Sequence, residues 1–463
     1  MRTTVSVSAF GAVCDGTLQT ARFQAAIDHC FEQGGGEVQV PAGKFLISSI
    51  RLRSGVTLHL MENAVLKGSR DPEDYFSYLD NDIEPLSPEK ITNAPYIHVS
   101  AIKGETAYDP DDPRYRYRRL PASRWNNAVI RAIDAENVAI IGEKGSVIDG
   151  SNCFDEQGEE LYRGPHAITF FNTRSITLRG YTVRDSANWA HNMLFCENIL
   201  MEDVEVLAGH DGFDAFTSSN ITIRNCRFYT GDDCIAGFGN SNVLITDCIL
   251  NSSCSGMRYS GTNTVVRNCR FYGPGKYLFR GSMTQEEKRS GTEVPGTTHR
   301  YNMLSAFCFY GDYSMPIPEQ PGNILIVDCT FENVDRFIHY HYFKNGYECF
   351  QNHRPLANIT FANIRATGIG MPLTVCAPEH LKVDVTLRCC EIELREGTDP
   401  MPLIRTENFR RIELDNVTVK GLKADHLILA RTDGDYVFRD VKCPLVEGQY
   451  IRKTDEEFVI CAI

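Results

Sequence analysis

Short runs of alternating apolar and polar residues recur along the chain, and each run ends near an Asn, Asp or Gly. NITIRNCRF from Asn220, NVLITDCIL from Asn242 and NTVVRNCRF from Asn263 start 22 and 21 residues apart. Alternation with a period of two predicts strands, and the Asn or Asp that follows predicts a bend. A strand, a bend and a second strand every 21–23 residues predict one coil of a parallel β-helix. The Leu-x-x-Leu-x-Leu pattern of a leucine-rich horseshoe is absent. The same unit starts at Ser175, Asn198, Asn323, Asn358 and Arg411.

The open N-terminal edge of such a solenoid needs a cap, because each coil buries its apolar residues only against its neighbours. Residues 19–33 predict an amphipathic capping helix that stops at the glycines of 34–36. Its predicted buried face consists of Phe23, Ala26, Ile27 and Cys30.

The repeat also predicts two ladders of stacked side chains. Cys226, Cys248, Cys269 and Cys329 occupy one slot of their coils, which predicts an inward ladder of small apolar side chains rather than a metal or redox site. The residues before them predict a polar ladder at the bend: Asn225, Asp247, Asn268 and Asp328.

Two long segments interrupt the repeat, at residues 71–125 and 284–303, and both are rich in polar residues or Pro. Long loops on a solenoid usually build a cleft or a subunit contact, so we expect both to border the cleft of a single domain spanning 1–463. If these loops close one end of the groove, an enzyme of this shape would cleave sugars from the ends of oligosaccharides.

Composition excludes several classes of function. A net charge of −13 disfavours nucleic acid as a partner, and no apolar run approaches the length of a membrane span. The first residues lack the apolar stretch of a secretory signal, and 17 cysteines would be awkward in an oxidising compartment. We therefore predict reduced thiols and a cytoplasmic protein.

Aspartates stand at equivalent places in two consecutive coils. Asp211 precedes the strand at Asn220 and Asp232 precedes the strand at Asn242, by nine and ten residues. Neighbouring strands lie about 4.8 Å apart, so carboxylates of adjacent coils are expected roughly 5–9 Å apart. That range overlaps the spacing of the two acids in inverting glycosidases. A polar turn ladder without catalytic function is the alternative that spacing alone leaves open.

The motifs around these acids resemble the polygalacturonase family of glycoside hydrolases. NWAH at 188–191, GHDGFD at 209–214 and GDDC at 231–234 are similar to that family's signatures, and the start of the chain is similar to its N-terminal cap and first coil. The resemblance implies a right-handed parallel β-helix of the pectin-lyase-like kind and hydrolysis with inversion. It implies that Asp232 is the general acid and that Asp211 and Asp233 activate the attacking water.

The sequence departs from the family pattern at several substrate-binding positions. His210 replaces the first Asn of the family motif, and SSCSGMRYSG puts Cys254 or Ser255 where the family has a histidine. The family's Arg-x-Lys motif is reduced to Arg280. The remaining candidates for substrate contacts are Arg258, His339, His341 and Lys344. His339 and His341 share a strand face in this prediction, while core packing is favoured for Tyr340 and Tyr342.

We therefore predict an exo-acting glycosidase for uronate-containing, pectin-like oligosaccharides. No cofactor and no metal are expected, and a homo-oligomer is left open. The alternatives are a β-helix lyase, epimerase or glycosyl transferase that uses the same acids, or a non-catalytic carbohydrate-binding solenoid. A lyase of this fold would usually require calcium.

Overall fold

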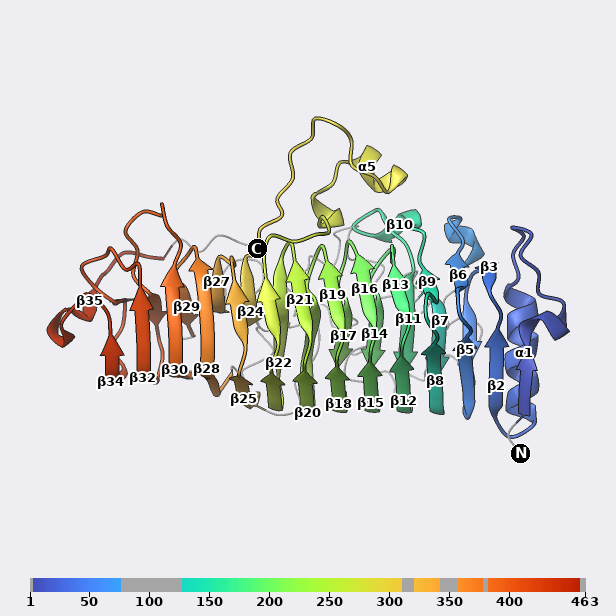
Figure 1. Cartoon of the computed structure of the whole chain (residues 1–463), viewed down its shortest axis with the longest axis horizontal. Coiled ribbons are helices and arrows are strands. Elements are labelled where there is room, and N and C mark those ends of the chain that lie inside the picture. Colours follow the sequence, from blue (N-terminus) through green and yellow to red (C-terminus); the bar gives the residue numbers. More distant parts are fainter. Residues whose placement is uncertain (1–2, 76–126, 310–319, 342–355, 378–381, 459–463) are drawn as a thin grey trace, which may run out of the picture.

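Parallel pairing runs through the described part of the chain, in which 34 strands form one continuous parallel sheet that winds into a solenoid (Figure 1). This computed structural model describes residues 3–75, 127–309, 320–341, 356–377 and 382–458. The predicted parallel β-helix is confirmed, with the right-handed winding expected of parallel crossovers. Each coil contributes up to three strands, and strands of successive coils stack in three ladders.

The first ladder holds the strands that begin the repeat unit and includes the long strands β20 and β22. Its strands are β1 (Thr3–Ser6), β2 (Gly36–Val40), β5 (Val56–Leu60), β8 (Glu136–Gly142), β12 (Arg174–Arg179), β15 (Glu197–Glu202), β18 (Ser219–Arg224), β20 (Ile235–Thr246), β22 (Ser255–Arg267), β25 (Gly322–Val327), β28 (Asn358–Ile369), β30 (Asp384–Leu394), β32 (Arg411–Lys420) and β34 (Asp435–Lys442).

The second ladder follows the bend and merges with the long strands from β28 onward. Its separate strands are β3 (Gly43–Ile47), β6 (Ala64–Gly68), β9 (Val147–Asp149), β13 (Thr182–Arg184), β16 (Glu205–Ala208), β19 (Arg227–Thr230), β21 (Ile249–Ser252), β23 (Arg270–Tyr272) and β26 (Thr330–Glu332).

The third ladder carries the candidate site on its outer face and shares β20 and β22 with the first. Its other strands are β4 (Ile50–Leu52), β7 (Ala128–Ile133), β11 (His166–Phe171), β14 (His191–Leu194), β17 (Phe213–Phe216), β24 (Ser305–Phe309), β27 (Arg336–His341), β29 (Leu373–Cys376), β31 (Ile404–Glu407), β33 (Ile428–Ala430) and β35 (Ile451–Lys453).

Both predicted side-chain ladders are confirmed. The four cysteines of the inward ladder are buried, and the backbone N–H of Cys269 donates to Cys329 Sγ at 3.5 Å. At the bend, Asn268 Nδ2 donates to Asp247 Oδ1 at 2.6 Å, and both residues have positive φ. Asn and Asp tolerate this left-handed backbone and bond the same residue of the next coil, which explains their recurrence.

The N-terminal cap is also confirmed. Helix α1 (Thr20–Glu32) lies across the first coil, and its four buried residues are the four that the sequence predicts. Gly34 and Gly35 follow with φ of 85° and 109°, a conformation that ends a helix and that side chains with a Cβ adopt rarely.

The two segments that interrupt the repeat contain short helices in addition to loops. Residues 76–125 of the first lie outside the described residues, and its start holds the 3-10 helix η2 (Pro72–Asp74). The second was predicted as a loop, yet it contains the helix α5 (Gln285–Ser290), which a Thr284–Glu287 capping box starts. The other short helices of the described residues are η1 (Val7–Phe10), η5 (Arg280–Ser282) and η6 (Glu447–Gln449).

Within the described residues, no helix combines the length and apolar character needed to cross a lipid bilayer.

Candidate active site

The predicted catalytic acids lie in the short turns that lead from the second ladder to the third. Asp211 lies between β16 and β17, and Asp232 and Asp233 lie between β19 and β20. Glycines precede the acids because another segment packs directly on these turns. A Cβ on Gly231 would approach Leu278 O to 2.2 Å, and one on Gly209 would approach Arg280 Cγ to 2.5 Å.

The structure brings the three predicted acids together. The backbone N–H of Asp233 donates to Asp211 Oδ1 at 3.2 Å, which links the two coils. Carboxylate oxygens of Asp232 and Asp233 and the Cys254 sulfur all lie within 4.8 Å of one another. Asp211 and Asp233 are buried, whereas Asp232 is half-buried. Asp232 is therefore the acid of this group that is most open to a substrate.

A fourth carboxyl, Asp214, belongs to the same group, although the sequence analysis did not select it. It ends the GHDGFD motif and lies on the outer face of β17, because its neighbours Phe213 and Ala215 face the core. Neither of its buried carboxylate oxygens has a hydrogen-bond partner. The motif itself was the signal that could have identified it.

Burial is the main reason why the pKa values of Asp211, Asp214 and Asp233 are raised. It raises the pKa of Asp211 and of Asp214 well above the usual range, and neighbouring carboxylates add to the effect. Burial also raises the pKa of Asp233 to about 7, although the Arg258 guanidinium opposes the shift. A group of carboxyls this close cannot ionise completely at neutral pH, so a proton is available for an acid-catalysed step.

Arg258 contacts the acid group, because its strand β22 stacks in the third ladder in register with the strands that follow the acids. Asp214 is in register with Ala236 of β20, and Ala236 is in register with Arg258 of β22. The Arg258 Nε donates to Asp233 Oδ2 at 2.6 Å, and the side chain is about one fifth exposed at 19%. Its charge is therefore already paired with a candidate catalytic carboxylate.

His339 lies two coils further along the same row, since Arg258 pairs with Cys308 and Cys308 pairs with His339. Its Nδ1 contacts Arg336 NH1 at 2.8 Å, and burial lowers its pKa well below the usual range. Burial lowers the pKa of His341 to about 4. Both histidines are therefore uncharged at neutral pH.

The prediction for Tyr340 is confirmed, since it packs in the core and stacks on Phe309 with ring centroids 5.0 Å apart. Tyr342 and Lys344 lie outside the described residues.

Cys254 and Ser255, which replace the family histidine, lie directly beside Asp233. Ser255 is among the groups that lower the pKa of the Asp233 carboxyl. The Cys254 thiol has a pKa raised well above its usual range by burial and by Asp232 and Asp233. It is therefore a protonated thiol next to the acids.

His210 and Arg280 lie on the opposite side of the acids from Arg258. His210 is fully buried between Tyr162 and Phe279, with ring centroids at 5.7 and 6.3 Å. Arg280 NH1 donates to Ala187 O at 3.2 Å and NH2 donates to Lys288 O at 3.1 Å. These bonds give Arg280 a positioning role for the segment that packs on the acid turns.

The acid group also has the composition of a weak metal site, formed by Asp232, Asp233 and Cys254. Its chemistry fits a cation poorly. Asp233 is already paired with Arg258, and the thiol would have to lose a proton that its surroundings stabilise. The prediction that no metal is needed stays a prediction.

Comparisons with known proteins agree with these motifs. Residues 91–257 match the family described as Glycosyl hydrolases family 28. A probable polygalacturonase of Vitis vinifera is 28% identical over 47% of this chain and 40% of its own length. The exo-poly-alpha-D-galacturonosidase of Dickeya chrysanthemi is 27% identical over 49% of this chain and 40% of its own length. The chain thus spans less than half the length of these two curated relatives.

Among solved structures, the family 28 exopolygalacturonase of Yersinia enterocolitica aligns with a TM-score of 0.64 and 16% identity, over 97% of this chain and 78% of that one. At this identity the likeness shows a shared fold. The matched segment, residues 91–257, contains the acids and their turns.

Proposed function

We propose that this protein is an exo-acting glycoside hydrolase of the polygalacturonase type that cleaves uronate-containing, pectin-like oligosaccharides. The observation that carries the proposal is the group of acids at consecutive turns, with half-buried Asp232 in front of buried Asp211 and Asp233. Two curated relatives with polygalacturonase and exo-poly-galacturonosidase names support the reaction class.

The proposed reaction is a single displacement. Asp232 donates its proton to the glycosidic oxygen as the bond to the anomeric carbon breaks. A water held by Asp211 and Asp233 attacks that carbon from the opposite face, and its proton passes to one of these carboxylates. The anomeric configuration is inverted, and the proton count of the acid group is restored by exchange between the acids and solvent.

Arg258 tunes this step through Asp233. Its guanidinium, 2.6 Å away, opposes the burial that raises the pKa of Asp233, so it increases the fraction of ionised base. Asp214 adds a further buried carboxyl behind the pair, and its charge is one of those that raise the pKa of Asp211.

The decisive experiment uses short uronate oligosaccharides of defined length. We expect release of one sugar from the chain end at the earliest times, a mass gain of one water per cleavage, and a product anomer opposite to the linkage in proton NMR. An unsaturated product would indicate a lyase, equal-mass products an epimerase, and binding without any product a non-catalytic solenoid.

We also propose a cytoplasmic location. All 15 cysteines of the described residues are free thiols, a pattern typical of a reducing compartment. Short oligosaccharides, unlike polymers, are substrates that can reach an enzyme there. Oxidation by thiol-specific reagents and location in fractionated cells test this part of the proposal independently of the reaction.

A further inference from the structure

The inserted segment between β23 and β24 docks on the acid turns and carries charge with it. Its residue Arg280 donates a backbone hydrogen bond to Gly209 O at 3.0 Å. Figure 1 shows the segment, with α5, at the same edge of the solenoid as strand β10 (Phe154–Glu159). Contact between them is direct: Arg289 of α5 lies over the Phe154 ring, 4.4 Å from its centroid.

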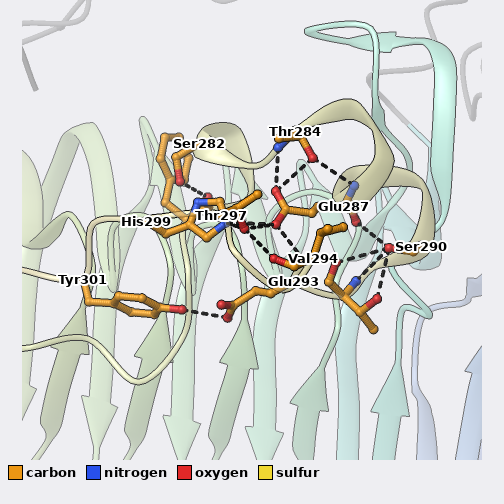
Figure 2. Close-up of polar contacts among 11 residues, drawn as sticks. Ser282, Thr284, Glu287, Ser290, Glu293, Val294, Thr297, His299 and Tyr301 are labelled. Carbon is orange, nitrogen blue, oxygen red and sulfur yellow. Dashed lines mark hydrogen bonds and ion pairs between the residues drawn. The ribbon is translucent and has the colours of Figure 1, made fainter.

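The buried Glu287 carboxylate holds the segment in one shape (Figure 2). It accepts hydrogen bonds from Thr284 N at 2.8 Å, Thr284 Oγ1 at 3.0 Å, Val294 N at 2.8 Å and Thr297 Oγ1 at 2.6 Å, and it contacts His299 Nε2 at 3.0 Å. The bonds from Thr297 and the others hold its pKa well below the usual range. A carboxylate that ties the start of a short helix to the following loop fixes the direction of the neighbouring side chains.

The next residue, Lys288, points into the protein. It is 8% exposed, and its Nζ lies 4.1 Å from the centroid of the buried Tyr162 ring. Arg163 and Arg280 lie near the same ring, at 5.9 and 5.6 Å from its centroid. Three cationic side chains therefore meet around one aromatic ring in a protein whose net charge is −13.

Among the described residues, two carboxyls lie near Arg163. Arg163 Nε lies 3.1 Å from Glu160 Oε2 and 3.9 Å from Glu159 Oε2. Burial raises the pKa of Glu159 to about 8, so this carboxyl is mostly protonated at neutral pH.

An unsatisfied polar side chain lies in the same place. His210 is fully buried, and neither ring nitrogen has a hydrogen-bond partner. Burial and the cations Arg163, Arg280 and Lys288 lower its pKa well below the usual range, so the ring is neutral and offers one N–H. A buried polar group without a partner is costly, which favours a site where a ligand supplies the missing bond.

The charged group adjoins the reaction centre. Asp232 is among the charges that raise the pKa of Arg163 and of Glu159. His210 precedes Asp211 in the same turn, so any group that bonds its ring lies next to the acids. A purely structural role for the cations would not require this proximity or the unpartnered imidazole.

We propose that Lys288, Arg163 and His210 form an anion subsite that binds the carboxylate of the sugar adjacent to Asp232. This inference rests on the proposed function and names the group that selects an acidic sugar. The sugar carboxylate accepts from the Lys288 ammonium and the Arg163 guanidinium, and one of its oxygens accepts from the neutral imidazole. The subsite lies on the N-terminal side of the acids, whereas Arg258 lies on the C-terminal side.

The test is Lys288→Met, measured with a uronate monosaccharide and its carboxyl-reduced neutral counterpart by isothermal titration calorimetry. We expect the Kd of the uronate to rise about ten- to a hundredfold, as loss of a charge-assisted hydrogen bond predicts, with little change for the neutral sugar. The matched control is Lys276→Met: Lys276 also lies 4.1 Å from a tyrosine ring centroid, that of Tyr229, but it is exposed.

Lys288→Gln is the second variant if Lys288→Met unfolds, because its amide can still lie over the Tyr162 ring. Glu287→Gln should raise KM for uronate oligosaccharides with a smaller change in kcat, since Glu287 acts by positioning Lys288. Unchanged uronate affinity in a folded Lys288 variant overturns the inference. Binding reports on the subsite even if no hydrolysis is detected, so failure of the subsite and failure of the proposed reaction are distinguishable.

Discussion

The two sides of the acid group offer a substrate different surroundings. On the C-terminal side, Arg258 is already paired with Asp233, and His339 and His341 are uncharged. On the N-terminal side, Lys288 lies over the Tyr162 ring, and burial raises the pKa of Glu159, one of the two carboxyls near Arg163. The C-terminal side therefore tunes the acids, and the N-terminal side gathers Arg163, Arg280 and Lys288 around one tyrosine ring.

The origin of the two sides explains the difference. Arg258 and His339 stand on strands of the repeat and point outward in register with Asp214. Arg163 and Lys288 stand on segments added between coils, one next to β10 and one on α5. The repeat builds the catalytic row, and insertions at the turns give it selectivity.

The largest expected effect is the loss of a catalytic acid. Asp211→Asn, Asp232→Asn and Asp233→Asn should each lower kcat by about 10²–10⁴-fold, because each removes an acid or base from the transition state. Circular dichroism and thermal unfolding check that the fold is intact. A variant that turns over uronate oligosaccharides at nearly the wild-type rate removes its residue from the mechanism.

Arg258→Ala should cost about 2–4 kcal/mol in apparent transition-state binding, through the acids rather than through substrate charge. Without the guanidinium, the pKa of Asp233 rises above its present value of about 7. The acidic limb of the kcat profile should therefore shift to higher pH. An unshifted profile, or a loss confined to charged substrates, would assign Arg258 to substrate binding instead.

Asp214→Asn should change stability in a pH-dependent way. The folded-state pKa of Asp214 is raised by burial, so the folded protein retains a proton that the unfolded chain releases as pH increases. Wild-type stability thus falls as pH rises from the unfolded pKa toward the raised folded value, and the variant lacks this loss. We expect the Tm of the variant to exceed that of wild type by on the order of a few degrees at pH 8, with no gain at pH 4. A gain of the same size at both pH values would contradict this account.

Chelation should have the smallest effect. Turnover after dialysis against EDTA should equal that of the untreated protein, since Asp233 is paired with Arg258 and the Cys254 thiol is protonated. Activity that disappears with EDTA and returns with calcium would favour the lyase alternative.

The sequence by itself determined the solenoid, because one short-range pattern recurs in every coil. The alternation that places Ile221 and Val243 in the core also places the cysteines and bend asparagines in stacked ladders. The same repeat brought Asp211 and Asp233 together, since residues at equivalent places in adjacent coils lie one strand spacing apart. The four buried residues of α1 followed from its helical period.

Only the tertiary structure decided what surrounds the acids on the N-terminal side. Lys288, Arg163 and His210 come from three separate segments, and the inserted segments have no periodic pattern that fixes where they fold. Sequence reasoning placed Arg280 at the substrate, but in the structure it donates to the carbonyls of Ala187 and Lys288. The position of Lys288 depends on the bonds to Glu287, which join residues up to 12 apart in a non-repeating loop. A repeat transmits position from one coil to the next, whereas an insertion acquires its position from the side chains on which it packs.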